Sequence, residues 1–287
     1  MTIEPGKLYV VATPIGNLAD LSFRALDTLK NVDLIAAEDT RHLKMLLNHY
    51  GINNSLMALH QHNEERACAG LIEKLQAGLS IALVSDAGTP LLSDPGLPLV
   101  KRVKEMGLDV VPIPGACALI AALSVAGLPV SPFYFAGFSP RTSSARKTFF
   151  TEQMCCPITW IFYESSHRIL ASIEDLADVL TPERTLVIAR EITKVHETIV
   201  KASLGEMLAL VKNNEMMRKG EFVVIVDGAP KKEHPTELTE EQEKILRILL
   251  KECTIKSAVA MAVDITGAKK KILYQTALAI QNQMGSE

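Results

Sequence analysis

The sequence predicts an α/β protein with two successive domains, each a sheet with flanking helices, followed by a small three-helix module. Short β-branched runs alternate with amphipathic helical stretches over residues 1–115. Strand-like runs then return with a different spacing, and a polar, proline-bearing segment precedes the last helical stretches. We therefore expect domains at residues 1–115, 116–230 and 236–287.

Composition limits the class of protein. The 287 residues are 48% hydrophobic and 22% charged, which is enough to bury a sizeable core. The net charge of -3 excludes a generally basic surface, although a local basic patch is enough to contact nucleic acid. Five cysteines without a CxxC pair indicate reduced thiols. The longest apolar run, residues 116–130, is shorter than the roughly 20 residues of a membrane span. We expect a cytoplasmic protein with no membrane segment.

The first domain is expected to contain a parallel sheet. Its predicted strands cover residues 8–13, 33–38, 55–60, 80–86 and 109–114. Helices are predicted between them, over residues 21–30, 41–51, 63–78 and 98–107. Three of these helices end in a glycine suited to a left-handed C-cap, at Gly51, Gly78 and Gly107. Such alternation is typical of a parallel sheet covered on both faces.

The second domain is expected to hold a mixed sheet. Its strands are predicted at residues 133–138, 158–163, 185–191, 196–203 and 221–228, and the closeness of the third and fourth indicates an antiparallel pair. The module has predicted helices at 240–252, 255–266 and 268–281, with caps at Thr239 and Thr254 and a break at Gly267. Three short helices of this kind resemble a helix-turn-helix. A helical cap that packs or dimerises is the alternative.

Four loops at the ends of predicted strands contain acids and bases. Residues 36–44, 84–96, 163–169 and 189–196 follow four different strands, and the last of them includes Lys194 and His196. In open α/β sheets, ligands bind at this edge, so we expect one shared cleft. The alternative is that these residues cap helices; in residues 84–96, Ser93 or Asp94 is expected to cap the next helix.

Several chemistries lack their sequence signature. The loop at residues 12–20 has Pro14 and a single glycine instead of GxGxxG, and the chain contains no P-loop. A hydrolase that uses Ser166 and His167 ranks last because the GxSxG elbow is missing. Neither HExxH nor a Cys/His cluster occurs, so we expect no metal site.

In chain order, the segments VATPIGNLADLSFRAL, AAEDTRH, SDAGTPLLSDPG, PGACALIAAL, FYESSHRI and ARE…TKVHE resemble the tetrapyrrole (class III) methylase family. Within it they resemble the branch that acts on small-subunit ribosomal RNA, over residues 7–228 and in the three-helix module. The resemblance implies the two-domain tetrapyrrole-methylase fold, a homodimer, and S-adenosyl-L-methionine bound in a cleft between two α/β domains. It also implies 2′-O-methylation of a cytidine ribose in the decoding region of 16S ribosomal RNA in the small ribosomal subunit.

The resemblance assigns cofactor contacts along the cleft. Thr89 stands where the family has an aspartate, and Asp86 is the candidate to supply that acid. The expected cofactor-binding residues are Pro14, Asp86, Gly88, Thr89, Pro90, Leu91, Gly115, Ala116, Cys117, Tyr163, Glu164 and Ala189.

Methylation of a ribose requires that its hydroxyl oxygen be aligned with the methyl donor. Because a hydroxyl is a poor nucleophile until its proton is removed, a positioned base should help. We hypothesise that the base is one of Glu38, Asp39, Glu164 and His167, and that Arg41, Arg168 or Arg190 positions the backbone phosphate. RNA contacts are expected at two basic patches, Arg141, Arg146 and Lys147, and Lys269, Lys270 and Lys271. The alternatives are a methyltransferase for a precorrin or sirohaem precursor and a non-catalytic RNA-binding assembly factor.

Overall fold

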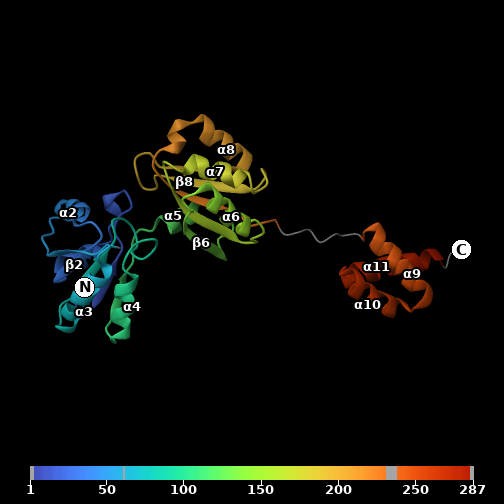
Figure 1. Ribbon diagram of the computed structural model, residues 1–287, viewed down its shortest axis with the longest axis horizontal. Coiled ribbons are helices and arrows are strands. Elements are labelled where there is room, and N and C mark those ends of the chain that lie inside the picture. The colour runs from blue at the N-terminus through green and yellow to red at the C-terminus, as the bar shows by residue number, and fades with distance from the viewer. Residues whose placement is uncertain (1–2, 61, 231–237, 285–287) are drawn as a thin grey trace. The chain divides into compact units, whose positions relative to one another are not determined.

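Five strands form a first sheet in which every pair is parallel. The order is β3-β2-β4-β1-β5. These strands are β1 (Leu8–Val11), β2 (Leu34–Ala37), β3 (Leu56–Ala58), β4 (Ile81–Val84) and β5 (Val110–Ile113). The helices that connect them are α1 (Phe23–Asn31), α2 (Thr40–His49), α3 (Glu64–Gln76) and α4 (Leu97–Glu105). Figure 1 shows this part of the chain in blue to green, with β2, α2, α3 and α4 labelled. The predicted parallel sheet is confirmed, and Gly51, Gly78 and Gly107 all have positive φ.

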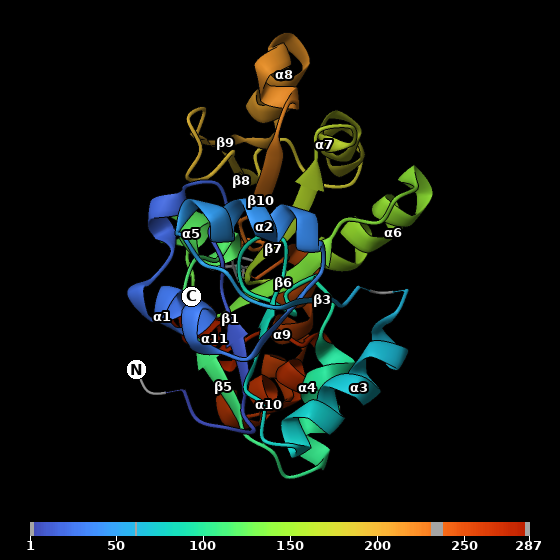
Figure 2. The same cartoon turned by 90° about the vertical axis from the view of Figure 1, so that its left-hand side faces the viewer.

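Two hydrophobic layers cover the faces of this sheet. Leu8, Ile81 and Leu83 pack against α3 and α4 on one face. Tyr9 and Ile35 pack against α1 and α2 on the other. Figure 2 shows α3 and α4 side by side. Because both faces are buried, β2 and β4 are apolar along their whole length.

The second sheet is mixed, with the order β6-β7-β10-β8-β9. Its strands are β6 (Phe133–Phe138), β7 (Thr159–Ser165), β8 (Thr185–Arg190), β9 (Thr198–Ser203) and β10 (Glu221–Val226). Only β6 and β7 pair in parallel, and the expected antiparallel pair of β8 and β9 is confirmed. The helices α6 (Ser143–Gln153), α7 (Ile169–Ala177) and α8 (Leu204–Asn213) pack on one face, and α5 (Ala118–Val125) packs on the other.

The structure describes residues 3–60, 62–230 and 238–284. The chain divides into two units, residues 1–229 and 230–287, so both predicted α/β domains lie in one unit. The second unit contains α9 (Glu240–Glu252), α10 (Ile255–Thr266) and α11 (Lys270–Met284), packed around a core of its own. The predicted caps at Thr239 and Thr254 and the left-handed Gly267 are confirmed. Residues 236–237 and 285–287 of the predicted module, and residues 231–237 of the predicted linker, lie outside the described residues.

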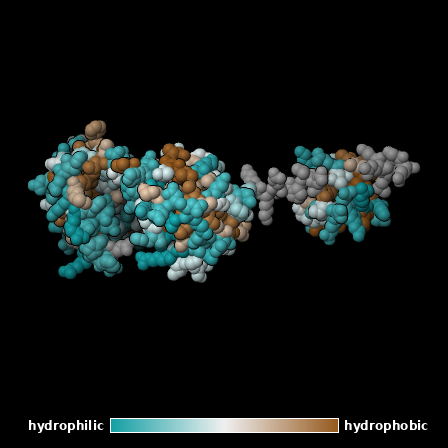
Figure 3. Space-filling view, turned by 90° about the horizontal axis from the view of Figure 1, so that it is seen from above, coloured by the Kyte–Doolittle hydropathy of each residue, from teal (hydrophilic) through white to brown (hydrophobic). Residues whose placement is uncertain are grey.

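The surface is polar with scattered apolar patches (Figure 3). Among the described helices, none combines the length and the apolar character that crossing a membrane requires.

Leu83→Ala tests the first core. Leu83 is buried in the middle of the sheet, so we expect its truncation to lower the free energy of unfolding by about 3 kcal/mol through lost contacts and a cavity. Urea titration followed by circular dichroism measures this change. Met106→Ala, at an exposed site, is the control and should change stability by less than about 0.5 kcal/mol. Equal losses in the two variants would contradict the assigned core.

Candidate active site

A cavity of about 470 Å³ lies in the α/β unit where the carboxyl edges of both sheets converge. Figure 3 shows a furrow between the two halves of this unit. The first half, which holds the first sheet, contributes Glu38 after β2 and residues 86–89 and 92–94 after β4. The second half, which holds the second sheet, contributes Phe138, residues 163–165 and Lys194. The predicted convergence of strand-end loops into one cleft is therefore confirmed.

The loop after β4 is held in place by backbone pairing with the end of β1. The Thr13 N–H donates to the Gly88 carbonyl (2.9 Å), and the Gly88 N–H donates to the Thr13 carbonyl (3.1 Å). Gly88 has φ of +80°, and a Cβ there would lie 3.2 Å from Cγ2 of Ile15, so both conformation and space favour glycine. The Thr89 hydroxyl donates to the Ala116 carbonyl (3.1 Å), which attaches the loop to the segment before α5.

Three carboxylates, those of Glu38, Asp86 and Asp94, line the cavity wall of the first half. Burial, with the negative charges of Asp86 and Asp94, raises the pKa of Glu38 above its ordinary value. Burial likewise raises the pKa of Asp94. This part of the cavity therefore favours a positively charged ligand, whose charge relieves the mutual repulsion. In the described part of the chain, no group of three or more His, Cys, Asp or Glu side chains could hold a metal ion.

Asp39 caps a helix instead of facing the cavity. Its carboxylate accepts the Arg41 N–H (2.8 Å) at the start of α2 and also binds the Arg41 guanidinium (2.9 Å). These contacts with Arg41 hold the pKa of Asp39 well below its usual range. The alternative prediction, that the residues of this loop cap a helix, therefore holds for Asp39 and its partner Arg41. Neither side chain lies on the cavity wall.

Glu164 is a buried anchor. Its carboxylate accepts hydrogen bonds from the hydroxyls of Ser139 and Ser172 and from the Ser165 N–H (2.9 Å), and it pairs with the Arg168 guanidinium (2.8 Å). Every partner occupies an oxygen of this carboxylate. These contacts give Glu164 a positioning role at the end of β7, and its expected role as a general base stays a prediction.

His167 and Ser166 do not form a nucleophilic pair. His167 is exposed and lies outside the residues that line the cavity. The Ser166 hydroxyl donates to the Gly220 carbonyl (2.6 Å) and accepts the Gly220 N–H (2.8 Å). Because both functions of this hydroxyl are used by backbone, the hydrolase alternative has no activated serine.

The expected cofactor-binding residues fall into two groups. Those that line the cavity are Asp86, Gly88, Thr89, Cys117, Tyr163, Glu164 and Ala189. Those that lie in the same loops beside the wall are Pro14, Pro90, Leu91, Gly115 and Ala116.

The expected cap at Ser93 or Asp94 is wrong. The N-cap of α4 is Gly96, whose N–H donates to the Glu64 carboxylate (2.7 Å), so Asp94 instead lines the cavity. Sequence reasoning missed Asp94 as a site residue because the SDPG stretch has the composition of a helix start. It also missed Phe138 and residues 221–223, whose place on the wall follows from the mixed order of the second sheet.

The basic patches differ in accessibility. Arg146 is only 4% exposed and pairs with the buried Asp175 (2.6 Å), so its guanidinium attaches α6 to α7 and we remove it from the predicted RNA contacts. Lys147 is half-exposed and pairs with Asp178 (2.6 Å), and Arg141 is exposed. In the module, Lys269, Lys270 and Lys271 are all exposed at the start of α11.

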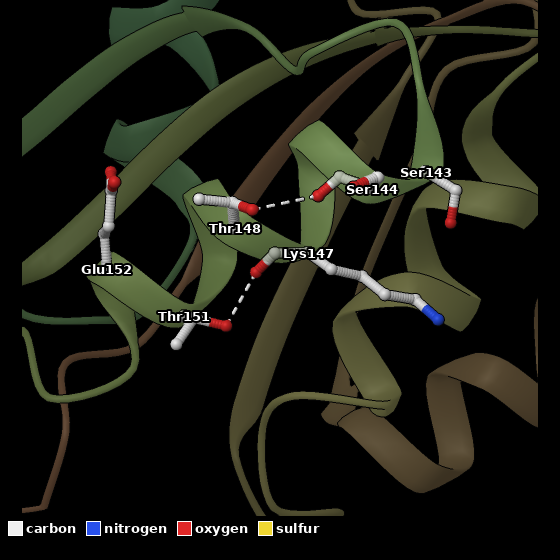
Figure 4. A pocket seen from close by; sticks show the side chains of 6 residues that line it. All are labelled: Ser143, Ser144, Lys147, Thr148, Thr151 and Glu152. Atoms are coloured by element: carbon white, nitrogen blue, oxygen red, sulfur yellow. Dashed lines mark hydrogen bonds between the residues drawn. The ribbon is translucent and has the colours of Figure 1, made fainter.

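A surface hollow on α6 is a weaker candidate site. Its wall contains Ser144, Lys147, Thr148 and Thr151 (Figure 4). The Thr148 hydroxyl donates to the Ser144 carbonyl (3.1 Å), and the Thr151 hydroxyl donates to the Lys147 carbonyl (2.7 Å). Because these protons are used within the helix, the hollow offers a ligand few donors.

Comparison with known proteins identifies the family. Residues 7–208 match the model of the Tetrapyrrole (Corrin/Porphyrin) Methylases, and residues 236–281 match that of the RsmI C-terminal HTH domain. The chain is 52% identical to Ribosomal RNA small subunit methyltransferase I of Escherichia coli O157:H7 over 96% of each chain. It is 48% identical to the Haemophilus influenzae protein of that name, covering 97% of this chain and 99% of the relative. The chain belongs to the tetrapyrrole methylase family.

Solved structures agree on the fold of the α/β unit. Diphthine synthase matches with a TM-score of 0.58 at 16% identity, over 77% of this chain and 90% of that one. The methyltransferase CobJ matches with a TM-score of 0.58 at 18% identity, over 78% and 95%. The predicted family and fold are confirmed, and this tetrapyrrole methylase is an S-adenosylmethionine-dependent methyltransferase.

The cleft of this methylase fits S-adenosylmethionine. Its volume lies in the range of small-molecule sites. The cofactor has a sulfonium and an ammonium group, which suit a wall with Glu38, Asp86 and Asp94. Burial raises the pKa of Tyr163 to about 12, so its ring stays neutral beside Phe138 and offers an apolar surface.

Glu164→Gln tests the anchor. An amide cannot accept from every present partner, and the buried Arg168 pair is lost, so we expect the free energy of unfolding to fall by about 3 kcal/mol. Chemical denaturation measures the change, and Glu174→Gln, on the same helix as Ser172 but half-exposed, is the control. Undiminished stability together with loss of methyl transfer would instead assign Glu164 to the chemistry.

Proposed function

We propose that this methylase transfers a methyl group to the ribose 2′-hydroxyl of a cytidine in the decoding region of 16S ribosomal RNA, in the small ribosomal subunit of the cytoplasm. Similarity to small-subunit RNA methyltransferases along nearly the whole chain, helix-turn-helix module included, carries the proposal. The exposed lysines at the start of α11, with Arg141 and Lys147, are the proposed RNA contacts. The homodimer implied by the family stays a prediction.

Glu38 is the proposed general base. It lies on the cavity wall, its pKa is raised, and the other candidate bases are capped, buried or outside the cavity. When bound, S-adenosylmethionine supplies a methyl group already activated on a sulfonium. The loop at residues 86–94 and Tyr163 would hold the cofactor. Glu38 would accept the proton of the 2′-hydroxyl as its oxygen gains the methyl group, and alignment supplies most of the acceleration.

The two alternatives have less support. The solved structures named for corrin or porphyrin substrates are 15–19% identical to this chain and establish only its fold. A non-catalytic assembly factor would have no need of a pre-formed cleft with a carboxylate of raised pKa.

Methylation mapping tests the proposed reaction. Small subunits from a strain without this protein are incubated with it and labelled S-adenosylmethionine, and the RNA is then cleaved with alkali. A 2′-O-methyl group removes the nucleophile for alkaline cleavage, so we expect one new resistant position, at a cytidine of the decoding region. Label on a base with unchanged cleavage would overturn the 2′-O assignment, and no label in the RNA would overturn the RNA substrate.

The pH dependence of methyl transfer tests the base. Glu38 is active when ionised, so the rate should rise with pH through its raised pKa and then level off. Glu38→Gln should lose this rise and lower kcat by about 10²-fold or more. Asp39→Asn, which keeps a capping side chain, is the control and should keep the profile. An unchanged acid limb in Glu38→Gln would move the role to Asp94, tested by Asp94→Asn.

A further inference from the structure

The loop between β8 and β9, residues 191–197, forms part of the cavity rim; we name it the rim loop. Glu191 and Thr193 have positive φ, of 52° and 69°, which few non-glycine residues adopt. The Thr193 N–H donates to the Glu197 carboxylate (2.6 Å), and the buried Arg190 donates to the His196 carbonyl (2.9 Å). The rim loop is therefore held in one shape by its own contacts.

The rim loop packs on the opposite half of the α/β unit. A Cβ at Gly16 would lie 2.4 Å from Cγ of Lys194 and 2.9 Å from Oγ1 of Thr193, so the loop rests directly on the segment after β1. The preceding residue, Ile15, lines the cavity and lies against Gly88. The rim loop and the loop after β4 (residues 86–94) therefore adjoin the same short segment.

Lys194 is the only cation among the described residues that line the cavity. Its ammonium lies 2.9 Å from carboxylate oxygens of both Glu191 and Glu221. Burial lowers its pKa, but the hydrogen bonds to Glu221 and Glu191 outweigh this and raise the pKa above its ordinary value, so the side chain stays charged. The Lys194 side chain is 30% exposed and that of Glu221 is 81% exposed, which places this pair at the solvent opening.

The charges of the cleft pose a problem for an RNA substrate. Glu38, Asp86 and Asp94 make the wall acidic, and the ribose that must enter has a phosphate on each side. Bringing a phosphate near uncompensated carboxylates is unfavourable, whereas a rim cation offsets this cost. Val195, 96% exposed, and the exposed His196 present the same loop to solvent, where a strand would arrive.

We propose that Lys194 binds the backbone phosphate next to the target ribose, exchanging Glu221 for a phosphate oxygen as the RNA enters. The inference rests on the proposed RNA substrate. Lys194 lies at the opening and pairs with a highly exposed carboxylate. This position favours a ligand that arrives from solvent over the carboxylate of an enclosed cofactor. Exchange costs little because an exposed ion pair contributes little stability.

Two variants that are expected to change KM in opposite directions test this proposal. Lys194→Gln should raise KM for small subunits about tenfold, and should reduce the slope of log(kcat/KM) against log[salt] by about 1, the signature of one lost phosphate contact. Lys194→Arg should restore both. Glu221→Gln removes the carboxylate that competes with phosphate, so it should lower KM about twofold. Lys101→Gln, also an ion-paired lysine, is the matched control.

Calorimetric titration with S-adenosylmethionine and thermal unfolding complete the test. Unchanged cofactor affinity and melting temperature in Lys194→Gln, with the altered salt slope, support the phosphate contact. An unchanged salt slope with weakened cofactor binding or a lowered melting temperature would overturn it, as would a higher KM in Glu221→Gln. Failure of the wild-type protein to methylate RNA would instead refute the proposed function, so the two failures are distinguishable.

Discussion

The buried carboxylate of Glu164 determines how the second half of the cleft is built. A charge removed from water is tolerated only when paired and fully hydrogen-bonded. Its partners come from the segment after β6, from β7 and from α7, so satisfying one charge fixes three elements at the edge where the cavity opens. The same contacts occupy the oxygens of Glu164, which is why the proposed proton-accepting role falls to Glu38 in the first half.

The first half has the opposite arrangement, with charges left incompletely compensated. Glu38 and Asp94 have raised pKa values because burial and neighbouring carboxylates oppose ionisation. A cationic cofactor compensates this charge, and a base of raised pKa is better matched to removing a hydroxyl proton near neutral pH. Glu164 and Glu38 therefore differ in environment, since Glu164 is paired with Arg168, whereas burial and neighbouring carboxylates raise the pKa of Glu38, the proposed base.

Local patterns allowed most of the fold to be predicted, and contacts between distant residues account for what was missed. The strands and the caps at Thr239, Thr254 and Gly267 depend on neighbouring residues, and they appear where expected. The prediction that Arg146 contacts RNA was wrong because its partner, Asp175, is 29 residues away in the sequence. The prediction that Asp94 caps α4 was wrong because Glu64, 32 residues from Gly96, supplies the acceptor at that helix start. Composition identifies which residue types are able to bind or react. Only the folded structure shows which of these side chains are already engaged in structural hydrogen bonds and ion pairs.

Charge separates the two ligands of the proposed reaction within one cleft. The cofactor is cationic and suits the carboxylates of the first half, while the RNA is a polyanion that needs a cation where it enters. A net charge of -3 thus does not oppose RNA binding, because the cations that matter are few and local. Exposed lysines on the module are the proposed second RNA contact on the same chain, and two such contacts would bind more strongly than either alone. Because salt weakens the exposed phosphate contacts far more than interactions inside the cleft, ionic strength should affect substrate binding while leaving the donor in place.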